Sequence, residues 1–391
     1  MTTHLMSTQS VQQPVSRTRR FFRAVGRGFK AAGILAAGLM TAGGAVAACR
    51  DVVNNGYDAS MGDAQTDMRS SQKNGQKDGD MEGDAVGKDA ETDAMPNDME
   101  TPKPVLRVVL ARATKGGFNL SLLEEDGSLT PLTSGVGVND LHPTWCIEGG
   151  VVTAVFESDR EGSMRLFKIE IDLSASPPVA TEPVALTDGS TVDQNPQCSN
   201  SGRVFYVCGE NLCSIHLDAS GLTVVFSNAA YTFKRSPSVS DAEDLMAFSA
   251  EFPAGSAPAV FGVELMGGIA TGEPVRITPE GVSASSPSLT ASGLSVAFNT
   301  PPSIVQVAVI DVGADSYRVL TVGSPEFPTI NGTPRFVRPN STIILFHSDS
   351  DRLGPSNIFS VPADGSTSPV DLSRDPAADY RTPEGRLFPA E

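Results

Sequence analysis

The sequence predicts an all-β fold, a six-bladed β-propeller of four-stranded antiparallel blades. Over residues 105–391, short runs rich in Val, Ile and Phe alternate with clusters of Gly, Pro, Asp and Ser. This texture is typical of short strands separated by turns. A Pro-led module also recurs at a spacing typical of propeller blades, and fragments at the two ends of the segment complement each other.

The recurring module is a Pro-led short strand, a polar turn and a second apolar strand that ends near Phe. The first copy reads PTWCIEGGVVTAVF, and a later one reads PSLTASGLSVAF. Successive copies begin 41 to 53 residues apart, at Pro143, Pro196, Pro237, Pro287, Pro334 and, in clipped form, Pro383. Two more strand-like segments follow each complete copy, such as MRLFKIEID and PVALTDG, which makes four strands per blade.

The two ends of the segment predict how the ring closes. Residues 105–135 contain the three later strands of a blade but no Pro-led first strand. The copy at Pro383 contains a first strand and little more. We therefore expect the C-terminal strand to complete the first blade, which leaves only short and protected sheet edges.

The stretch Asp140–Gly162 carries the most complete copy of the repeat. Its pattern is Asp140, Pro143-x-Trp145, then Phe156-x-Ser-Asp-Arg-x-Gly162, and residues 346–354 repeat the later half of it. These residues resemble the TolB-type propeller repeat, over about residues 105–391. The resemblance implies a propeller, but it does not extend to the α/β domain or the partner contacts of TolB, because residues 50–104 cannot form that domain.

Residues 1–48 are expected to be a lipoprotein signal peptide of the twin-arginine type. They contain six basic side chains and no acidic one, and the segment 31–49 is apolar but short and rich in Ala and Gly. Residues 46–49, VAAC, resemble the lipobox of bacterial lipoproteins, and Arg19-Arg20 resembles a twin-arginine motif. This implies a lipid on Cys49 and attachment to a membrane. The alternative is an ordinary N-terminal helix.

Residues 49–104 are expected to form a disordered acidic tether. Residues 50–104 contain 13 acidic and 6 basic side chains, and residues 63–104 lack aromatic side chains. Such a segment cannot bury enough apolar surface to offset its ordering entropy. As a flexible coil it would span about 40 Å. Arg50 after the lipid-bearing cysteine favours the outer membrane of a bacterial envelope, with the domain facing the periplasm or the surface.

The net charge argues against a nucleic-acid partner. The chain sums to −17, and because its first 48 residues are basic, the remainder sums to −23. Phosphate binding needs a clustered basic surface instead. No zinc site is expected either, since the four His residues do not cluster at metal-ligand spacing. We therefore expect neither metal nor cofactor.

Four cysteines lie in the predicted propeller, and export implies an oxidising compartment. Cys208 and Cys213 flank a short hairpin connection, which would place their sulfurs on opposed residues and favours a disulfide. Cys146 and Cys198 lie on neighbouring inner strands, one position apart relative to the repeat Pro. Their side chains should face opposite sides, so a disulfide is less favoured here than between Cys208 and Cys213, and the pairing of Cys146 with Cys198 stays open.

Two features of the repeat have both a structural and a functional interpretation. Trp145 takes the place of apolar residues in other copies, which favours packing between blades over ligand stacking. The cluster Ser158–Gly162 is either an acid/base or cation loop, or the turn between the second and third strands. Its Asp and Gly, and its recurrence at residues 348–354, favour the turn. The acidic residues at 349–351 are only a weak calcium pattern, because a dedicated calcium site needs six to eight oxygen ligands.

The residues just before each inner strand should ring one mouth of the central channel. The ring is polar and mixed in charge, which fits either a solvated rim or a ligand site. Loop residues Asp159, Arg160, Asp349 and Arg352 are expected at the same face. The binding candidates at the mouth are Asp140, His142, Asp193, Asn195, Lys234, Arg235, Asn331, Tyr380 and Arg381.

Two functions are compatible with these patterns. The first is a lipid-anchored binding or scaffold module of the bacterial envelope, which would present its channel mouth to another envelope protein or a cell-wall fragment. The second is a glycan-processing enzyme, which needs two carboxyl groups about 5–10 Å apart, and Asp140 and Asp193 are the candidates. No nucleophile elbow or phosphate loop is visible, so we expect a binding protein and not an enzyme.

Overall fold

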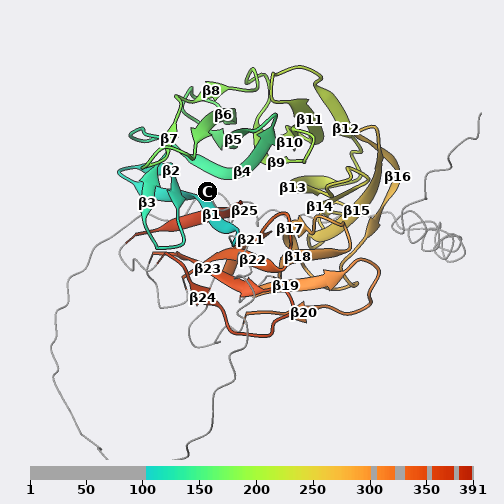
Figure 1. Cartoon of the computed structure of the whole chain (residues 1–391). Helices are drawn as coiled ribbons and strands as arrows, with labels where there is room; N and C mark the ends of the chain where they lie inside the picture. Colours follow the sequence, from blue (N-terminus) through green and yellow to red (C-terminus); the bar gives the residue numbers. More distant parts are fainter. Residues whose placement is uncertain (1–102, 301–305, 322–330, 350–354, 374–377, 390–391) are drawn as a thin grey trace, which may run out of the picture. The chain divides into compact units, whose positions relative to one another are not determined.

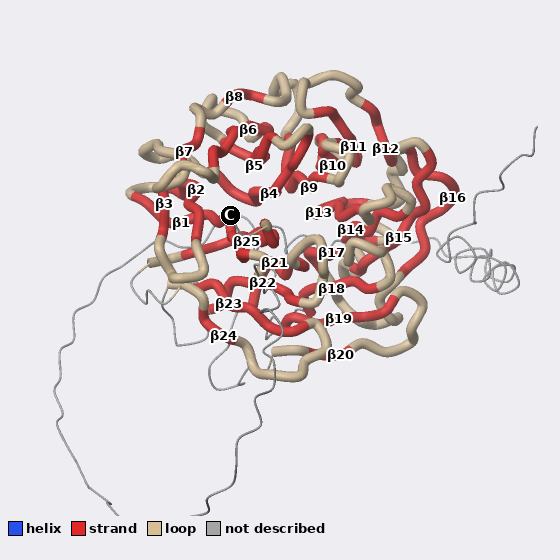
Figure 2. The backbone as a smooth tube through the Cα atoms, in the orientation of Figure 1, coloured by secondary structure: helices blue, strands red, loops and turns tan. Residues whose placement is uncertain are grey.

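The computed structural model describes residues 103–300, 306–321, 331–349, 355–373 and 378–389. The expected signal peptide, the lipidation site at Cys49 and nearly all of the expected tether lie outside these ranges. Within them the chain consists of strands joined by turns, as Figure 2 shows. A helix long and apolar enough to cross a membrane is not found in this described part.

Six sheets surround a central axis, and each corresponds to one predicted blade (Figure 1). Blade 1 contains β25 (Tyr380–Phe388), β1 (Val105–Thr114), β2 (Gly117–Leu123) and β3 (Leu129–Pro131). Blade 2 contains β4 (Asp140–Glu148), β5 (Val151–Ser158), β6 (Arg165–Asp172), β7 (Val179–Ala180) and β8 (Val184–Ala185). Blade 3 contains β9 (Asp193–Cys198), β10 (Arg203–Cys208), β11 (Asn211–His216) and β12 (Thr223–Phe226). Blade 4 contains β13 (Thr232–Val239), β14 (Leu245–Glu251), β15 (Ala259–Met266) and β16 (Ile269–Arg276). Blade 5 contains β17 (Ser285–Leu289), β18 (Ser295–Thr300), β19 (Gln306–Asp311) and β20 (Arg318–Val319). Blade 6 contains β21 (Asn331–Phe336), β22 (Ile343–Ser348), β23 (Asn357–Pro362) and β24 (Val370–Asp371).

The predicted closure is confirmed. Strand β25 pairs antiparallel with β1, from Val105 opposite Phe388 to Arg112 opposite Tyr380. The C-terminal strand is therefore the inner strand of blade 1, and Figure 1 shows it beside β1. Blade 2 departs from the four-stranded plan, because its outer strand is divided into β7 and β8, which both pair with β6.

The hydrophobic core lies between the blades. The described residues form six buried clusters, and each cluster combines side chains of two neighbouring blades. The Phe near the end of the second strand of the repeat is almost completely buried in blades 2, 4, 5 and 6, as Phe156, Phe248, Phe298 and Phe346, and the buried Tyr206 takes this position in blade 3. Burying one such side chain contributes about 1.5–3 kcal/mol, so the repeat Phe is a packing residue.

Trp145 packs between blades, as expected. Its ring is 3% exposed and lies edge-on to Phe388, with 5.3 Å between the ring centroids. Its indole Nε1 donates a hydrogen bond to the Glu384 carbonyl oxygen over 3.0 Å. Because Phe388 and Glu384 belong to β25, this single Trp joins blade 2 to the strand that closes the ring.

Both cysteine pairs of the propeller form disulfides, and all four sulfurs lie in the cluster between blades 2 and 3. Cys208 joins Cys213 across the β10–β11 hairpin, with 5.8 Å between their Cα atoms. The two residues are diagonal and not opposed as expected, since Cys208 pairs with Asn211 and Cys213 with Tyr206.

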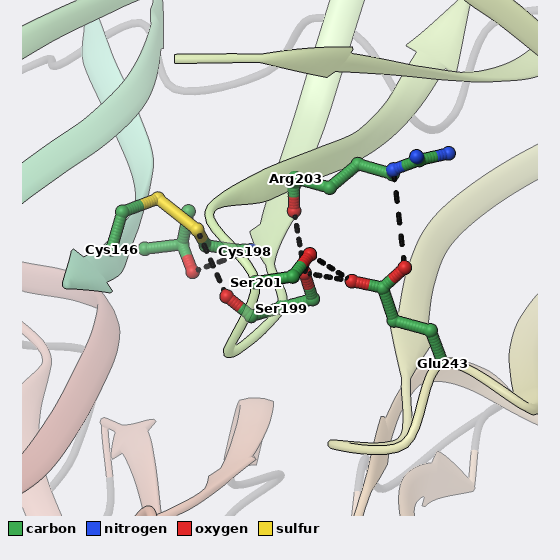
Figure 3. The surroundings of a disulfide bond; sticks show 7 residues. Cys146, Cys198, Ser199, Ser201, Arg203 and Glu243 are labelled. Carbon is green, nitrogen blue, oxygen red and sulfur yellow. Dashed lines mark hydrogen bonds and ion pairs between the residues drawn. A yellow bond between two sulfur atoms is a disulfide. The ribbon is translucent and has the colours of Figure 1, made fainter. Parts of the chain in front are cut away.

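Cys146 and Cys198 also pair, although their positions in the repeat made this the less favoured disulfide. These residues form a disulfide between β4 and β9, with 5.5 Å between their Cα atoms, as Figure 3 shows. Cys198 is equivalent to Trp145, which faces back toward the preceding blade, whereas Cys146 is the next residue and faces forward. Cys146 on blade 2 therefore points toward blade 3, and Cys198 on blade 3 points toward blade 2, so their sulfurs meet in the interface between these blades.

Candidate functional site at the channel mouth

Each inner strand contains one residue in the left-handed region directly before its repeat Pro. Left-handed backbone in a residue other than Gly costs of order 1–3 kcal/mol and often marks a functional or tightly constrained site. The pairing of inner and second strands shifts register at the same place in every blade, which identifies a bulge. With φ between 46° and 53°, the six residues are His142, Asn195, Ser236, Ser286, Thr333 and Thr382.

Hydrogen bonds between these residues link successive blades around the axis. The His142 backbone N–H donates to Thr382 Oγ1 over 3.2 Å, which joins blade 2 to blade 1. The Ser236 N–H donates to Asn195 Oδ1 over 3.3 Å, which joins blade 4 to blade 3. Side chains that contact their equivalents on neighbouring blades must ring the channel. We call this ring, at the start of the inner strands, the mouth.

A close contact between His142 and Glu157 lies at the mouth. Nδ1 of His142 is 3.0 Å from Oε1 of Glu157, and the Glu157 side chain is 3% exposed. The other oxygen, Oε2, accepts the Asn195 backbone N–H over 2.5 Å. Burial by itself would raise the pKa of Glu157, but His142, the Asn195 N–H and the charge of Arg235 together outweigh it and lower the pKa. Glu157 is therefore held as a carboxylate by three blades.

On blade 6 a histidine, His347, occupies the place that Glu157 has on blade 2. His347 follows the repeat Phe of β22, as Glu157 follows that of β5, and its Nδ1 lies 2.8 Å from Thr333 Oγ1. Burial, and then repulsion from Arg381, lowers the pKa of His347 to about 3. The ring is therefore neutral at physiological pH. The backbone of Gly332 lies so close that a Cβ there would overlap the His347 ring.

Sequence reasoning missed both Glu157 and His347. The available signal was a polar residue between the repeat Phe and a Ser, in the triplets FES and FHS. In the sequence this place looks like the end of a strand. Only the bulge of the neighbouring inner strand brings it into contact with the left-handed residue before the Pro.

Six of the nine mouth candidates are buried. Asp140 is fully buried, and its carboxylate accepts hydrogen bonds from Thr133 Oγ1 and Ser158 Oγ, both at 2.6 Å, and from Arg160 Nη2 at 2.7–2.8 Å. The loop residue Arg160 is therefore engaged with the framework. The other five buried candidates are Asp193, Asn195, Lys234, Asn331 and Tyr380.

Two of these buried groups have clear local partners. Asp193 accepts a hydrogen bond from Thr191 Oγ1 over 2.6 Å, and burial raises the pKa of its carboxyl. The Lys234 ammonium donates to the carbonyl oxygens of Asn228 and Tyr231, and burial lowers its pKa. Neither side chain is presented to solvent in the channel.

The remaining three candidates, His142, Arg235 and Arg381, are exposed or partly exposed at the mouth. Arg235 is exposed, and its charge acts on Glu157. Arg381 pairs with Asp379 over 3.0 Å and lies over the Phe118 ring at 5.1 Å. The mouth thus combines cationic groups with one buried carboxylate.

The loops expected to extend the mouth behave mainly as turns. Asp159 accepts hydrogen bonds from the backbone N–H and side-chain amide of Asn139, both at 2.7 Å, and its carbonyl accepts the Gly162 N–H. Asp349 directly follows β22, and Arg352 lies outside the described residues. Groups of three or more His, Cys, Asp or Glu that could hold a metal ion are not found among the residues that the structure describes.

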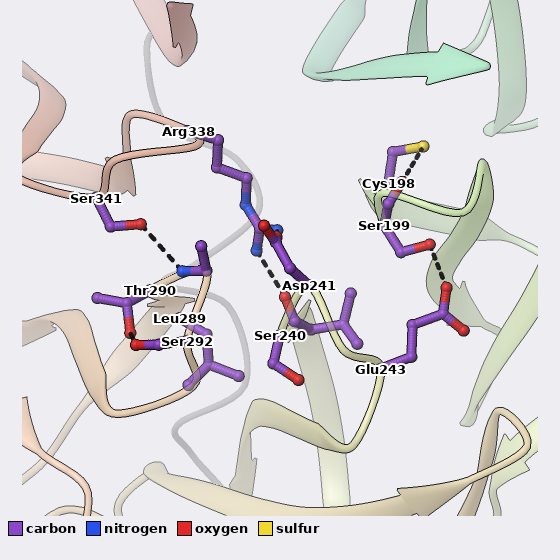
Figure 4. A network of polar contacts seen from close by, with 12 residues as sticks. Cys198, Ser199, Ser240, Asp241, Glu243, Leu289, Thr290, Ser292, Arg338 and Ser341 are labelled. Atoms are coloured by element: carbon purple, nitrogen blue, oxygen red, sulfur yellow. Dashed lines mark hydrogen bonds and ion pairs between the residues drawn. The ribbon is translucent and has the colours of Figure 1, made fainter. Parts of the chain in front are cut away.

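At the opposite end of the channel, hydrogen bonds link the hairpins between first and second strands (Figure 4). Ser199 Oγ donates to Glu243 over 2.5 Å, the Asp241 N–H donates to the Ala291 carbonyl over 2.8 Å, and the Ala291 N–H donates to Ser341 Oγ over 3.0 Å. These bonds join blades 3, 4, 5 and 6 in succession.

One arginine also crosses this hairpin end. Arg338 of blade 6 donates to the Asp241 carboxylate and, over 2.6 Å, to the Val239 carbonyl, both on blade 4 (Figure 4). Deeper in the ring, Arg335 of blade 6 pairs with Glu384 of blade 1 over 3.4 Å. Both members are buried, and burial lowers the pKa of Arg335 and raises that of Glu384. These contacts join blades at the hairpin end and inside the ring, whereas the exposed Arg235 and the partly exposed His142 and Arg381 lie at the mouth.

Comparisons with known proteins support the fold alone. No family model matches the chain, and no curated protein matches it in sequence. TolB from Acinetobacter baumannii is similar in structure, with a TM-score of 0.55, 14% identity, and coverage of 74% of this chain and 67% of that one. Kuenenia stuttgartiensis hydrazine synthase follows with a TM-score of 0.54 and 13% identity, over 74% and 48% of the two chains. A puromycin-hydrolyzing peptidase of Mycobacterium tuberculosis has a TM-score of 0.48 and 13% identity, over 72% and 48%. The chain is thus a six-bladed propeller similar to that of TolB.

Proposed function

We propose that this protein is a binding or scaffold module of a bacterial envelope, and that its channel mouth recognises an envelope protein or a cell-wall fragment. In this proposal, lipid on Cys49 anchors it to the membrane, in the outer membrane and facing the periplasm or the surface. Residues 50–104 act as the tether.

The observation that carries the proposal is the convergence of His142, Glu157, Asn195 and Arg235 at the mouth. Three blades supply these groups, and Glu157 is kept ionised in a buried place. Six backbone bulges, each with a strained residue, surround them. Strain and buried charge of this kind cost stability, and they are common where a protein is organised to bind. The likeness to TolB at the level of the fold is consistent with a binding role, as an analogy only.

The glycan-processing alternative has less support. Its two candidate carboxylates are buried, and Asp140 is fully engaged with Thr133, Ser158 and Arg160. A general acid or base must reach the proton that it transfers. Neither Asp140 nor Asp193 has that access in this arrangement.

The test compares partner capture from envelope extracts by the full-length protein and by two charge-reversal variants. Arg235→Glu alters an exposed cation of the mouth, and Arg318→Glu is the matched control on outer strand β20, which is also exposed. We expect Arg235→Glu to lose a crosslinked partner or wall fragment that the wild type and Arg318→Glu retain. Equal capture by all three proteins would exclude the mouth as the binding surface.

A further inference from the structure

A cavity of about 540 Å³ lies between blades 4 and 5, apart from the channel mouth. This volume falls within the range of about 300–1,000 Å³ that is usual for small-ligand sites. Blade 4 lines it with Tyr231, Phe252, Phe261 and the segment 274–280, and blade 5 with residues 312–315. Nothing in the repeat or in the channel network requires a cavity here.

The wall from blade 4 is aromatic. Phe252 stacks on Tyr231 with 4.4 Å between ring centroids, and Phe261 meets Tyr231 edge-on at 5.2 Å. Tyr231 and Phe261 are buried, whereas Phe252 remains 43% exposed. One face of Phe252 is therefore covered by Tyr231, and the remaining aromatic surface is available to a ligand.

Blade 4 departs from the repeat in the segment that carries this wall. Strand β13 has two register shifts against β14, where the other inner strands have one. The extra shift comes with Phe233, which is left-handed at φ 51° and 63% exposed. A bulky residue in that conformation is unusual and often belongs to a functional segment.

The rim of the cavity is acidic. Glu280 of blade 4 and Asp315 of blade 5 line it, both are exposed, and neither has a side-chain hydrogen bond or ion pair within the described part of the chain. Arg276 is the cation of the lining, and its guanidinium donates to the carbonyl oxygens of Thr278 at 3.0 Å and Val282 at 2.9 Å. Glu273 lies close enough that its charge, after burial, raises the pKa of Tyr231. The carboxylates thus outnumber the single engaged cation.

We propose that this cavity binds an organic cation, such as a quaternary ammonium group or the basic side chain of a partner. An aromatic face attracts a cation that lies within about 6 Å of the ring, most strongly when the cation is poorly hydrated. Unpaired carboxylates at the rim add long-range attraction and favour a ligand of opposite charge. Phe252 supplies the ring, and Glu280 and Asp315 supply the charge.

The experiment measures binding to the full-length protein by calorimetry, with choline and its neutral isostere 3,3-dimethylbutan-1-ol as probes. Wild type should bind choline at least fivefold more tightly than the neutral alcohol. Two further probes, n-butylammonium and n-butylguanidinium, separate a small quaternary ligand from a lysine or arginine side chain. Equal affinity for choline and the alcohol would overturn the proposal and indicate an apolar or polyol site.

Three variants test the assigned roles. The double variant Glu280→Gln/Asp315→Asn should weaken choline binding about tenfold and leave the alcohol unchanged, because only the charge is removed. Phe252→Leu keeps an apolar side chain and the two carboxylates, and it should reduce the preference for choline over the alcohol without removing it. Glu182→Gln, an exposed carboxylate on blade 2, is the matched control and should bind as wild type. An unchanged choline preference in Phe252→Leu, with folding verified by circular dichroism, would refute the aromatic role.

Discussion

Removal of the disulfide between Cys146 and Cys198 should destabilise the propeller more than removal of Cys208–Cys213. The first pair spans 52 residues of sequence and joins two blades, whereas the second spans 5 residues within one hairpin. In the chain-entropy model, closing a loop of about 50 residues contributes about 4 kcal/mol to the free energy of unfolding, and closing a loop of about 6 residues contributes about 2 kcal/mol.

The matched variants are Cys146→Ala/Cys198→Ala and Cys208→Ala/Cys213→Ala. All four cysteines are buried in the same cluster, so the loss of apolar contact is similar in both variants and largely cancels. The expected difference in the free energy of unfolding is therefore about 2 kcal/mol. The variant that lacks the inter-blade bond should also show the larger m-value, because its unfolded chain is less compact.

The assay is urea unfolding of the oxidised proteins, followed by fluorescence. Trp145 is the single Trp of the chain, and it lies in the interface that closes the ring. Its emission therefore reports loss of the ring and not of one hairpin. Equal destabilisation of the two variants, or a larger effect of Cys208→Ala/Cys213→Ala, would refute the loop-length reasoning.

Three further outcomes are expected. Phe388→Ala should lower the free energy of unfolding by about 3 kcal/mol and shift the emission of Trp145 to the red, since the ring that covers the indole is lost; an unshifted spectrum would contradict this contact. His347 has a pKa of about 3 in the folded protein and 6.5 in the unfolded chain. As the pH falls from 6.5 to 3, the unfolded chain binds a proton that the folded protein does not, so the free energy of unfolding decreases by about 1.4 kcal/mol per pH unit. His347→Gln should reduce this slope in urea titrations at pH 4.5, 5.5 and 7, and parallel slopes would show that the imidazole is not buried neutral. Gly332→Ala should destabilise the protein through overlap with the His347 ring, and Gly332→Ala/His347→Ala should lose less than the sum of the two single changes.

The architecture could be read from the repeat because every blade buries the same kinds of residue. The spacing of the Pro-led copies predicts six blades, and the incomplete copies at 105–135 and Pro383 predict closure by β25, which the pairing with β1 confirms. The divided outer strand of blade 2 was not predictable in this way. Outer strands are short and half exposed, so their pairing depends on local turns and not on the period.

The mouth was only partly predictable. The position of His142 in the repeat correctly places this residue at the start of an inner strand. The repeat does not predict that Asp140, two residues earlier, is fully buried whereas His142 is partly exposed. The six bulges decide the difference, because each changes the direction of the side chains around the left-handed residue. Glu157 enters the site only through this bulge.

Local alternation along the strands and the period of the repeat were sufficient for the type of fold, the number of blades and the burial of Trp145. These depend on short-range patterns that each blade repeats. The pairing of Cys146 with Cys198, the partner of His142 and the cavity between blades 4 and 5 depend on two segments that face each other across an interface. Their relative direction is a property of the closed ring, so only the tertiary structure determines them.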